Sequence, residues 1–218
     1  APEIKLVVMF FGSAVSYHFS QQLLKKAGAL QTRRVSLGRA GDRLFCFCAG
    51  IGIDADVVEV VDAHPRLKSR FGAWYYTSAA TRTFMRRYLI KPPRMVVSTD
   101  GEEHECVSFL AQKGDPYSYF GDRPLHITTP ETLDSQTLSA ITLGRASPID
   151  MPFVASRVLV ERLVVSNHKH VTSLDGLTQA TVRSADDRRI SLQVDGDNIG
   201  QFNEIELGVR PNALSVVA

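Results

Sequence analysis

The chain has 218 residues, of which 44% are hydrophobic and 22% are charged, and its formal net charge is +2. This composition is typical of a folded globular protein with a sizeable core. No apolar run reaches the roughly 18 to 20 residues that a membrane-spanning helix requires, so the sequence excludes a transmembrane helix.

The first 32 residues differ in pattern from the rest of the chain. Residues 4–11 form an apolar run that predicts a buried strand, and residues 19–30 have the spacing of a short amphipathic helix. A domain boundary is expected near residue 33, so the predicted units are a strand-helix segment, 1–32, and a larger domain, 33–218.

From residue 33 onward the chain consists of short apolar runs separated by turn residues. Two longer helical patterns interrupt them, at 72–89 and 152–160. The fold class predicted is therefore α+β and β-rich, an antiparallel β-sandwich with one or two covering helices. The clearest strand patterns lie at 34–37, 43–48, 95–98, 105–111 and in the alternating residues near 190–194 and 205–209.

The three cysteines give little support for a metal or disulfide site. Cys46 and Cys48 are two residues apart in a strand-like run, which places them on one face of a strand, and Cys106 is distant. A zinc site needs about four ligands at suitable spacing. We therefore expect reduced thiols in the core and a reducing compartment.

A first motif, Gly-Ile-Gly-Ile-Asp-Ala-Asp-Val-Val, occupies residues 50–58. Its glycines, Gly52 among them, allow close backbone approach, and Asp54 and Asp56 place acidic groups in an apolar run. These carboxylates are candidates for contact with a polar head group. The alternative is a strand that ends in a glycine turn with a capping aspartate.

Residues 63–99 form a cationic segment without any Asp or Glu. Arg66, Lys68, Arg70 and Trp74 are its candidates for a membrane-facing surface, since basic side chains attract anionic head groups. The alternative is a solvated helix face. Aromatic residues accompany the basic ones, but no recognised nucleic-acid-binding module does, so nucleic acid is not an expected partner.

Two further motifs follow. Residues 114–125 are rich in Pro, Gly and aromatic residues, and they predict a loop in which Tyr117 is a candidate to line an apolar groove. The alternative is a turn with packed tyrosines. Residues 193–200 contain Asp195-Gly196, a strong hairpin signal, followed by Asp197. A tight turn is also a rigid place from which to present a carboxylate.

Taken in order, the three motifs resemble the carboxyl-terminal domain of the diacylglycerol kinase family of bacterial lipid kinases, which are related to sphingosine and ceramide kinases. The resemblance runs from about residue 33 to 218. It implies phosphoryl transfer from ATP, with Mg²⁺, to a hydroxyl of a diacylglycerol-like lipid. It implies Asp197 as the general base, at a position where the family carries Glu. The substrate-binding residues that it implies are Gly52, Asp54, Asp56, Tyr117, Asp195 and Gly196.

The family's nucleotide-binding lobe carries a GGDGT signature, and these 218 residues contain no Gly-Gly pair. This chain alone is therefore expected to be inactive. Residues 1–32 are either a remnant of that lobe or the lead-in to the following domain. The resemblance places the protein in the cytoplasm, at the inner face of the membrane, and allows a homo-oligomer. The alternative is a non-catalytic lipid- or membrane-binding protein of the same fold.

The family also builds a structural magnesium site around a DDG-like turn. The matching stretch here is residues 133–138, in which Asp134 is the candidate ligand and Gln136 stands at the glycine position. One carboxylate does not make an oxygen cage. His168 and His170 are expected to be surface residues.

Overall fold

The computed structural model describes residues 32–217, except 121–122, 130, 161–162 and 187. The strand and the helix predicted at 4–11 and 19–30 lie outside the described residues. The proposed boundary near residue 33 therefore stays a prediction.

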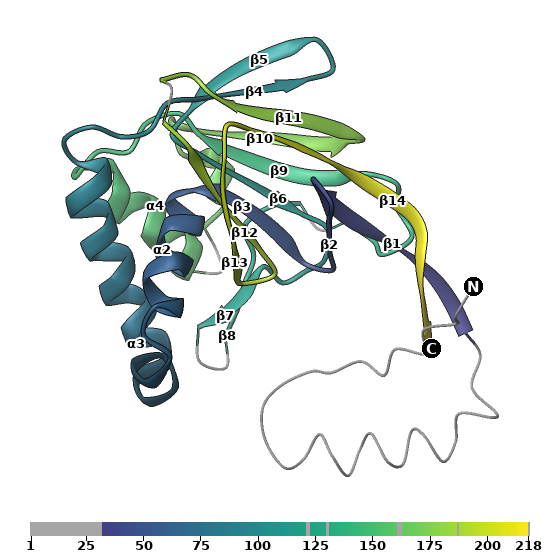
Figure 1. The fold of residues 1–218 in the computed structure, drawn as a ribbon, viewed down its shortest axis with the longest axis horizontal. Coiled ribbons are helices and arrows are strands. Elements are labelled where there is room, and N and C mark those ends of the chain that lie inside the picture. Colours follow the sequence, from purple (N-terminus) through teal and green to yellow (C-terminus); the bar gives the residue numbers. More distant parts are fainter. Residues whose placement is uncertain (1–31, 121–122, 130, 161–162, 187, 218) are drawn as a thin grey trace.

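Two antiparallel six-stranded sheets face each other (Figure 1). The first sheet has the order β2 (Arg43–Phe45), β1 (Thr32–Ala40), β14 (Glu204–Val217), β11 (Gln179–Ser184), β4 (Met95–Thr99), β5 (Glu102–Cys106). The second has the order β10 (Val171–Leu177), β9 (Leu138–Leu143), β6 (Ser108–Gln112), β3 (Cys48–Gly52), β12 (Ile190–Val194), β13 (Asp197–Phe202). A small hairpin consists of β7 (Ser118–Phe120) and β8 (Arg123–Leu125).

The main core lies between the two sheets. Alternating side chains of β12 and β14, such as Leu192 and Leu207, meet there with Phe45 and Phe109, all of them buried. This alternation is what the sequence pattern predicted. The β-rich α+β sandwich is thus confirmed, with three α-helices in the described residues instead of one or two.

A helical layer covers the outer face of the second sheet. It comprises α2 (Ile53–Asp62), α3 (Pro65–Thr83) with a π-helical extension η1 (Phe84–Tyr88), α4 (Asp150–Leu159) and the short 3₁₀ turn η2 (Val165–Asn167). Helix α4 packs through Met151, Val154 and Val158 against a buried cluster that includes Tyr88 of η1 and Leu143 of β9. The helix predicted at 72–89 is confirmed, but it begins earlier, at Pro65, because proline is favoured in the first turn. None of the helices in the described part of the chain is long and apolar enough to cross a membrane.

Two strands predicted as continuous are broken, and each break carries the chain from one sheet to the other. The run 43–48 splits at residues 46–47, where the carboxylate of Asp195 accepts hydrogen bonds from the backbone N–H groups of Cys46, Phe47 and Cys48 at 2.7, 2.9 and 3.0 Å. The run 105–111 splits at Val107 between β5, which belongs to the first sheet, and β6, which belongs to the second. Period-two patterns continue across both breaks, so the sequence alone does not reveal them.

The break also corrects the placement of two cysteines. Cys46 and Cys48 do not share a face of one strand: Cys48 is buried, and Cys46 is half-buried in the connection. All three thiols are free, and burial raises the pKa of each above its usual value. They therefore stay protonated and poorly nucleophilic near neutral pH.

Helix α2 is absent from the sequence prediction, which expected a strand and a turn at 50–58. Strand β3 runs directly into the helix through Gly52, whose φ is +89°. A Cβ there would lie 2.7 Å from the backbone oxygen of Val107. Glycine is therefore required at this junction, both for its backbone conformation and for space.

We expect Asp195→Asn to lower the free energy of unfolding by about 1–2 kcal/mol, because an amide donor replaces one acceptor oxygen facing backbone N–H groups. Asparagine tolerates the positive φ of residue 195, which is 48°. Urea denaturation measures the change. The control Asp197→Asn removes a nearby exposed carboxylate and should change stability by less than about 0.5 kcal/mol. Equal effects of the two substitutions would contradict the role given to Asp195.

Candidate functional site

The three sequence motifs meet at one buried carboxylate, that of Asp54 in the first turn of α2. The hydroxyl of Tyr117 donates to Asp54 Oδ1 at 2.5 Å, and Gln193 Nε2 donates to Asp54 Oδ2 at 2.6 Å. Gln193 Oε1 in turn accepts from the backbone N–H of Gly196 at 2.8 Å. Segments 50–58, 114–125 and 193–200 are thereby joined by side chains that sequence reasoning, apart from Gln193, had singled out separately.

The backbone around Asp54 is shaped to admit its carboxylate. Gly50 of β3 lies beside it, and a Cβ at that position would lie 2.0 Å from Asp54 Oδ2. Any larger residue would displace the carboxylate from Gln193. Glycine is needed at residue 50 because the Asp54 carboxylate occupies the space that a Cβ would fill.

Burial raises the pKa of Asp54, while the hydrogen bonds from Tyr117 and Gln193 oppose that shift because they stabilise the ionised form. Burial and the nearby Asp54 raise the pKa of Tyr117 well above its usual value. Tyr117 therefore remains a hydroxyl donor. Both oxygens of Asp54 already have donors within the protein, so contact with a lipid hydroxyl would require one of them to move.

Asp56 belongs to a different cluster. Its carboxylate accepts from Tyr88 Oη at 2.8 Å, Ser191 Oγ at 2.7 Å and Arg87 Nη1 at 3.0 Å. Burial, followed by the effect of Asp56, raises the pKa of Tyr88. Asp54 and Asp56 therefore do not form a pair: Asp56 ties α2 to η1 and to β12.

Asp195-Gly196 forms the turn between β12 and β13, as predicted. Both residues have positive φ, 48° and 87°, which is the combination of a type I′ hairpin turn. Asp197 is the first residue of β13 and lies opposite Val194, in the strand pair next to the turn. Its side chain is exposed, and within the described part of the chain it has no hydrogen bond or ion pair. Asp195 is exposed as well, but its carboxylate is engaged by backbone N–H groups, whereas no described residue donates to the carboxylate of Asp197.

The predicted membrane-facing residues lie in α3. Arg66 is exposed, and Trp74 exposes 76% of its surface. Lys68 and Arg70 lie in the same helix, but their side chains are outside the described residues. Arg87, also in the cationic segment, is ion-paired with Asp56 and Glu59 and so is not part of a free cationic face.

The turn that matches the family's magnesium site, where a single carboxylate argued against a metal, is organised around a lysine. Lys113 is fully buried, and its Nζ lies 3.0 Å from Thr132 O, 2.7 Å from Ser135 O, 2.6 Å from Ser135 Oγ and 3.2 Å from Thr137 O. These oxygens converge as they would on a metal ion, but an ammonium group occupies the centre. Asp134 points elsewhere, to an ion pair with Arg33.

The residues around Asp134 therefore do not fit Mg²⁺. The carbonyl oxygens are engaged by Lys113, and the described residues contain no group of three His, Cys, Asp or Glu side chains that could hold a metal. Burial lowers the pKa of Lys113, and the charge of Glu131 opposes that shift. Sequence reasoning missed Lys113 because it is separated from the turn by about twenty residues.

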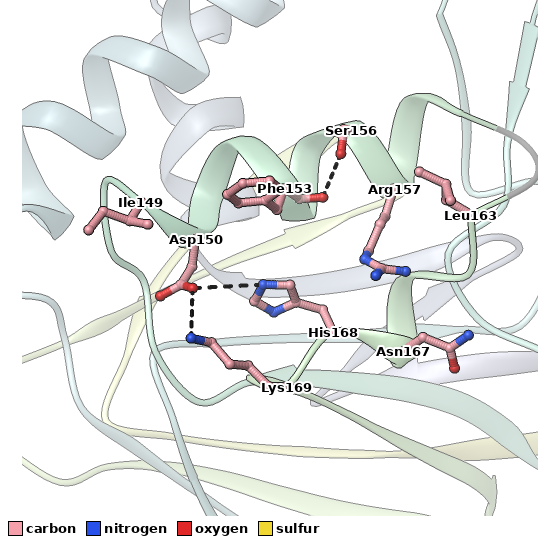
Figure 2. Close-up of a pocket in the computed structure, with 9 residues that line it drawn as sticks. All are labelled: Ile149, Asp150, Phe153, Ser156, Arg157, Leu163, Asn167, His168 and Lys169. Carbon is pink, nitrogen blue, oxygen red and sulfur yellow. Dashed lines mark hydrogen bonds and ion pairs between the residues drawn. The ribbon is translucent and has the colours of Figure 1, made fainter.

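A further cluster surrounds Asp150 at the start of α4. Ring nitrogens of His168 and His170 lie 3.9 and 3.4 Å from its carboxylate, and Lys169 Nζ lies 3.2 Å away. Figure 2 shows His168 and Lys169 beside Asp150. The expectation of surface histidines is wrong for His168, which is buried. The sequence did contain a signal for the position of Asp150. Ser147 and Asp150 have the spacing of a capping box at a helix start, and in the structure Ser147 Oγ accepts from the N–H of Asp150 at 3.1 Å.

No protein-family model matches the sequence, and no curated protein matches it. The fold, however, is similar to solved structures from Bacillus anthracis strain Sterne that are described as diacylglycerol kinases, provisionally in two of the three. The similarity has a TM-score of 0.63 at 13% identity for one, covering 94% of this chain and 61% of that chain. The second structure has a TM-score of 0.62 at 15% identity, and the match covers 93% of this chain and 61% of that chain. The third has a TM-score of 0.59 at 15% identity, and the match covers 91% of this chain and 59% of that chain. This chain thus has the fold of one part of those proteins and spans about three fifths of their length.

Tyr117→Phe should destabilise the protein by about 1.5–3 kcal/mol at about pH 8, because the buried Asp54 carboxylate loses a donor. The pKa of Asp54 in the folded state already lies above its unfolded value, and loss of the hydroxyl raises it further. As the pH falls, the folded state of the variant takes up the proton first, so the loss of stability shrinks. Urea denaturation at about pH 8 and about pH 5 measures this, and an equal loss at both pH values would contradict it.

Lys113→Met should lower the free energy of unfolding by about 3 kcal/mol, because the carbonyl oxygens lose their cation. Thermal unfolding of the unsubstituted protein should be the same in EDTA and in MgCl₂. The control Asp134→Asn breaks only an exposed ion pair and should cost at most about 1 kcal/mol. Destabilisation of the unsubstituted protein by EDTA would show that a metal, and not Lys113, holds this turn.

Proposed function

We propose that this chain is the acceptor-binding part of an ATP-dependent lipid kinase that phosphorylates a hydroxyl of a diacylglycerol-like lipid. The observation that carries the proposal is the convergence of the three motif segments on Asp54, beside a hairpin turn from which Asp197 extends into solvent. The fold likeness to diacylglycerol kinases over most of the chain supports it.

In this proposal Asp197 is the general base. It accepts the proton of the lipid hydroxyl as that oxygen attacks the γ-phosphorus of ATP, and the bond to the departing ADP breaks. Asp195 and Gly196 hold the turn that presents Asp197. Asp54, Tyr117 and Gly52 shape the neighbouring wall for the substrate, and Asp56 anchors α2, which carries Asp54.

Catalysis of phosphoryl transfer depends mainly on positioning and on neutralising the charge of the phosphates. The described residues near Asp197 do not include a phosphate cradle, and the sequence has no Gly-Gly pair. We therefore assign ATP and its Mg²⁺ to a nucleotide-binding lobe of the kind that the family carries. The proposed setting is the cytoplasmic face of the membrane, where the lipid substrate resides; nucleic acid is not a proposed partner, and a homo-oligomer is compatible with the proposal.

A second candidate function is non-catalytic binding to lipid or to an anionic membrane. It is favoured by α3, which exposes Trp74 and Arg66 in a segment without acidic residues. An indole ring is suited to the boundary between head groups and acyl chains. The two candidates differ in whether ATP is consumed.

Asp197→Asn should lower kcat for ATP-dependent phosphorylation of dispersed diacylglycerol about 100-fold or more, because the amide cannot accept the hydroxyl proton. The assay uses the gene product that contains this chain and, separately, the chain itself, which we expect to be inactive. Production of phosphatidic acid from labelled ATP is the measurement.

The matched control is Glu102→Gln, since Glu102 also follows an Asp-Gly turn with positive φ, between β4 and β5 of the other sheet. It should change kcat less than about twofold. If Asp195→Asn remains folded and abolishes turnover while Asp197→Asn does not, the base is misassigned. If no form of the protein turns over but vesicle binding is retained, the non-catalytic candidate is favoured.

A further inference from the structure

The outer side of α4 and the chain that follows it expose large apolar side chains. Ile149 exposes 76% of its surface, Phe153 61% and Val164 54%. Leu159, Val160 and Leu163 expose between 40% and 47% each. Single exposed apolar residues need no explanation, but six within sixteen positions are unusual on a protein surface.

These exposed residues are not the face by which α4 packs on the core. Helix α4 already has an apolar inner face, formed by Met151, Val154 and Val158, which packs on η1 and the second sheet. Ile149 and Phe153 are four residues apart and therefore lie on one side of the helix. The helix is thus apolar on two sides, and within the described part of the chain one of them has no protein layer over it.

Cationic and polar groups lie beside this apolar rim. A hollow of about 440 Å³ has the apolar side chains of Ile149, Phe153 and Leu163 in its lining (Figure 2). The rest of the lining is polar or charged: Asp150, Ser156, Arg157, Asn167, His168 and Lys169. Arg157 donates to the backbone oxygen of Val164 at 3.1 Å, and no carboxylate pairs with it among the described residues. Lys169 is paired with Asp150, yet its side chain is 69% exposed. Because the Asp150 carboxylate is already paired with Lys169, Arg157 and the exposed part of Lys169 are the groups of the hollow that can offer donors and positive charge to an anion.

We propose that this surface, formed by Ile149, Phe153, Arg157, Leu163, Val164 and Lys169, docks on a bilayer that contains anionic phospholipid. The apolar side chains enter the boundary between head groups and acyl chains. Arg157 and Lys169 contact lipid phosphates beside the rim, as long basic side chains do at interfaces. Each basic residue near an anionic surface contributes about 1 kcal/mol, or about fivefold in partitioning.

Charge favours a membrane over a second copy of the chain as the occupant. In a two-fold symmetric dimer through this surface, the same patch meets itself. Arg157 would then face the apolar rim and the cations of its partner, with Asp150 already paired to Lys169. A bilayer with anionic head groups supplies the missing negative charge together with an apolar phase.

This inference deepens the proposed function, because it names the surface by which a lipid kinase would reach its substrate, and it rests on that function only for the identity of the lipid. It differs from the α3 candidates, Arg66 and Trp74, in residues and in element. Vesicle binding is measured without ATP. Loss of turnover in Asp197→Asn with binding intact would bear on the proposed function alone, and loss of binding would bear on this inference alone.

The test is co-sedimentation of the folded protein with vesicles of phosphatidylcholine, or of phosphatidylcholine and phosphatidylglycerol in equal parts. We expect binding to the anionic vesicles, and at least about a tenfold loss of partitioning in the double variant Ile149→Ser, Phe153→Ser. Lys169→Gln should weaken binding to anionic vesicles about fivefold. Leu133→Ser, which removes an apolar residue exposed to 44% elsewhere, should bind as the unsubstituted protein does.

Three outcomes would overturn the proposal. The first is binding by the double variant equal to that of the unsubstituted protein, with Trp74→Ser abolishing it instead. The second is no binding to either type of vesicle. The third is a change of mass from dimer to monomer in the double variant, measured by analytical ultracentrifugation, with vesicle binding unaltered. Circular dichroism and thermal unfolding of each variant confirm that it is folded.

Discussion

The arrangement of the candidate site depends on one buried carboxylate, that of Asp54. A carboxylate in the interior is costly unless donors surround it, and Tyr117 and Gln193 supply them from two other segments of the chain. Because each donor comes from a different motif, satisfying Asp54 brings the loop after β6 and the strand before the β12–β13 turn to the start of α2. One electrostatic requirement thus fixes the relative positions of all three motifs.

The β12–β13 turn has two carboxylates with opposite tasks. The carboxylate of Asp195 accepts from three consecutive backbone N–H groups where the chain passes from the first sheet to the second. Asp197 is exposed, and its carboxylate has no donor among the described residues. The first makes the turn rigid and the second gains a fixed position from that rigidity, which is the property a positioned base requires. A variant of Asp195 would therefore affect Asp197 through geometry alone.

The fold class, the Asp195-Gly196 hairpin and the helix at 72–89 could be predicted because their signals are local: alternation, turn residues and helical spacing. The breaks at 46–47 and at Val107, helix α2 and the cage around Lys113 could not. Each depends on residues far along the chain. The break at 46–47, for example, is held by Asp195, which lies about 150 residues from Cys48. Within the site, Asp54 and Tyr117 were singled out separately, but their contact, and Gln193 that completes it, followed only from the fold.

Lys113 occupies a cluster of oxygen atoms in the turn where the sequence resemblance implied a magnesium site. A divalent ion held by carbonyl oxygens alone would leave most of its charge uncompensated, which is why such sites also contain carboxylates. An ammonium group carries half that charge, is covalently attached to the chain and needs only about three acceptors. Here four oxygens lie within 3.2 Å of Lys113 Nζ. Lys113 holds the turn through these oxygens, and Asp134 pairs with Arg33 of β1. Order in this loop then does not depend on the concentration of a metal, and any magnesium that the proposed reaction needs belongs with the phosphates of ATP.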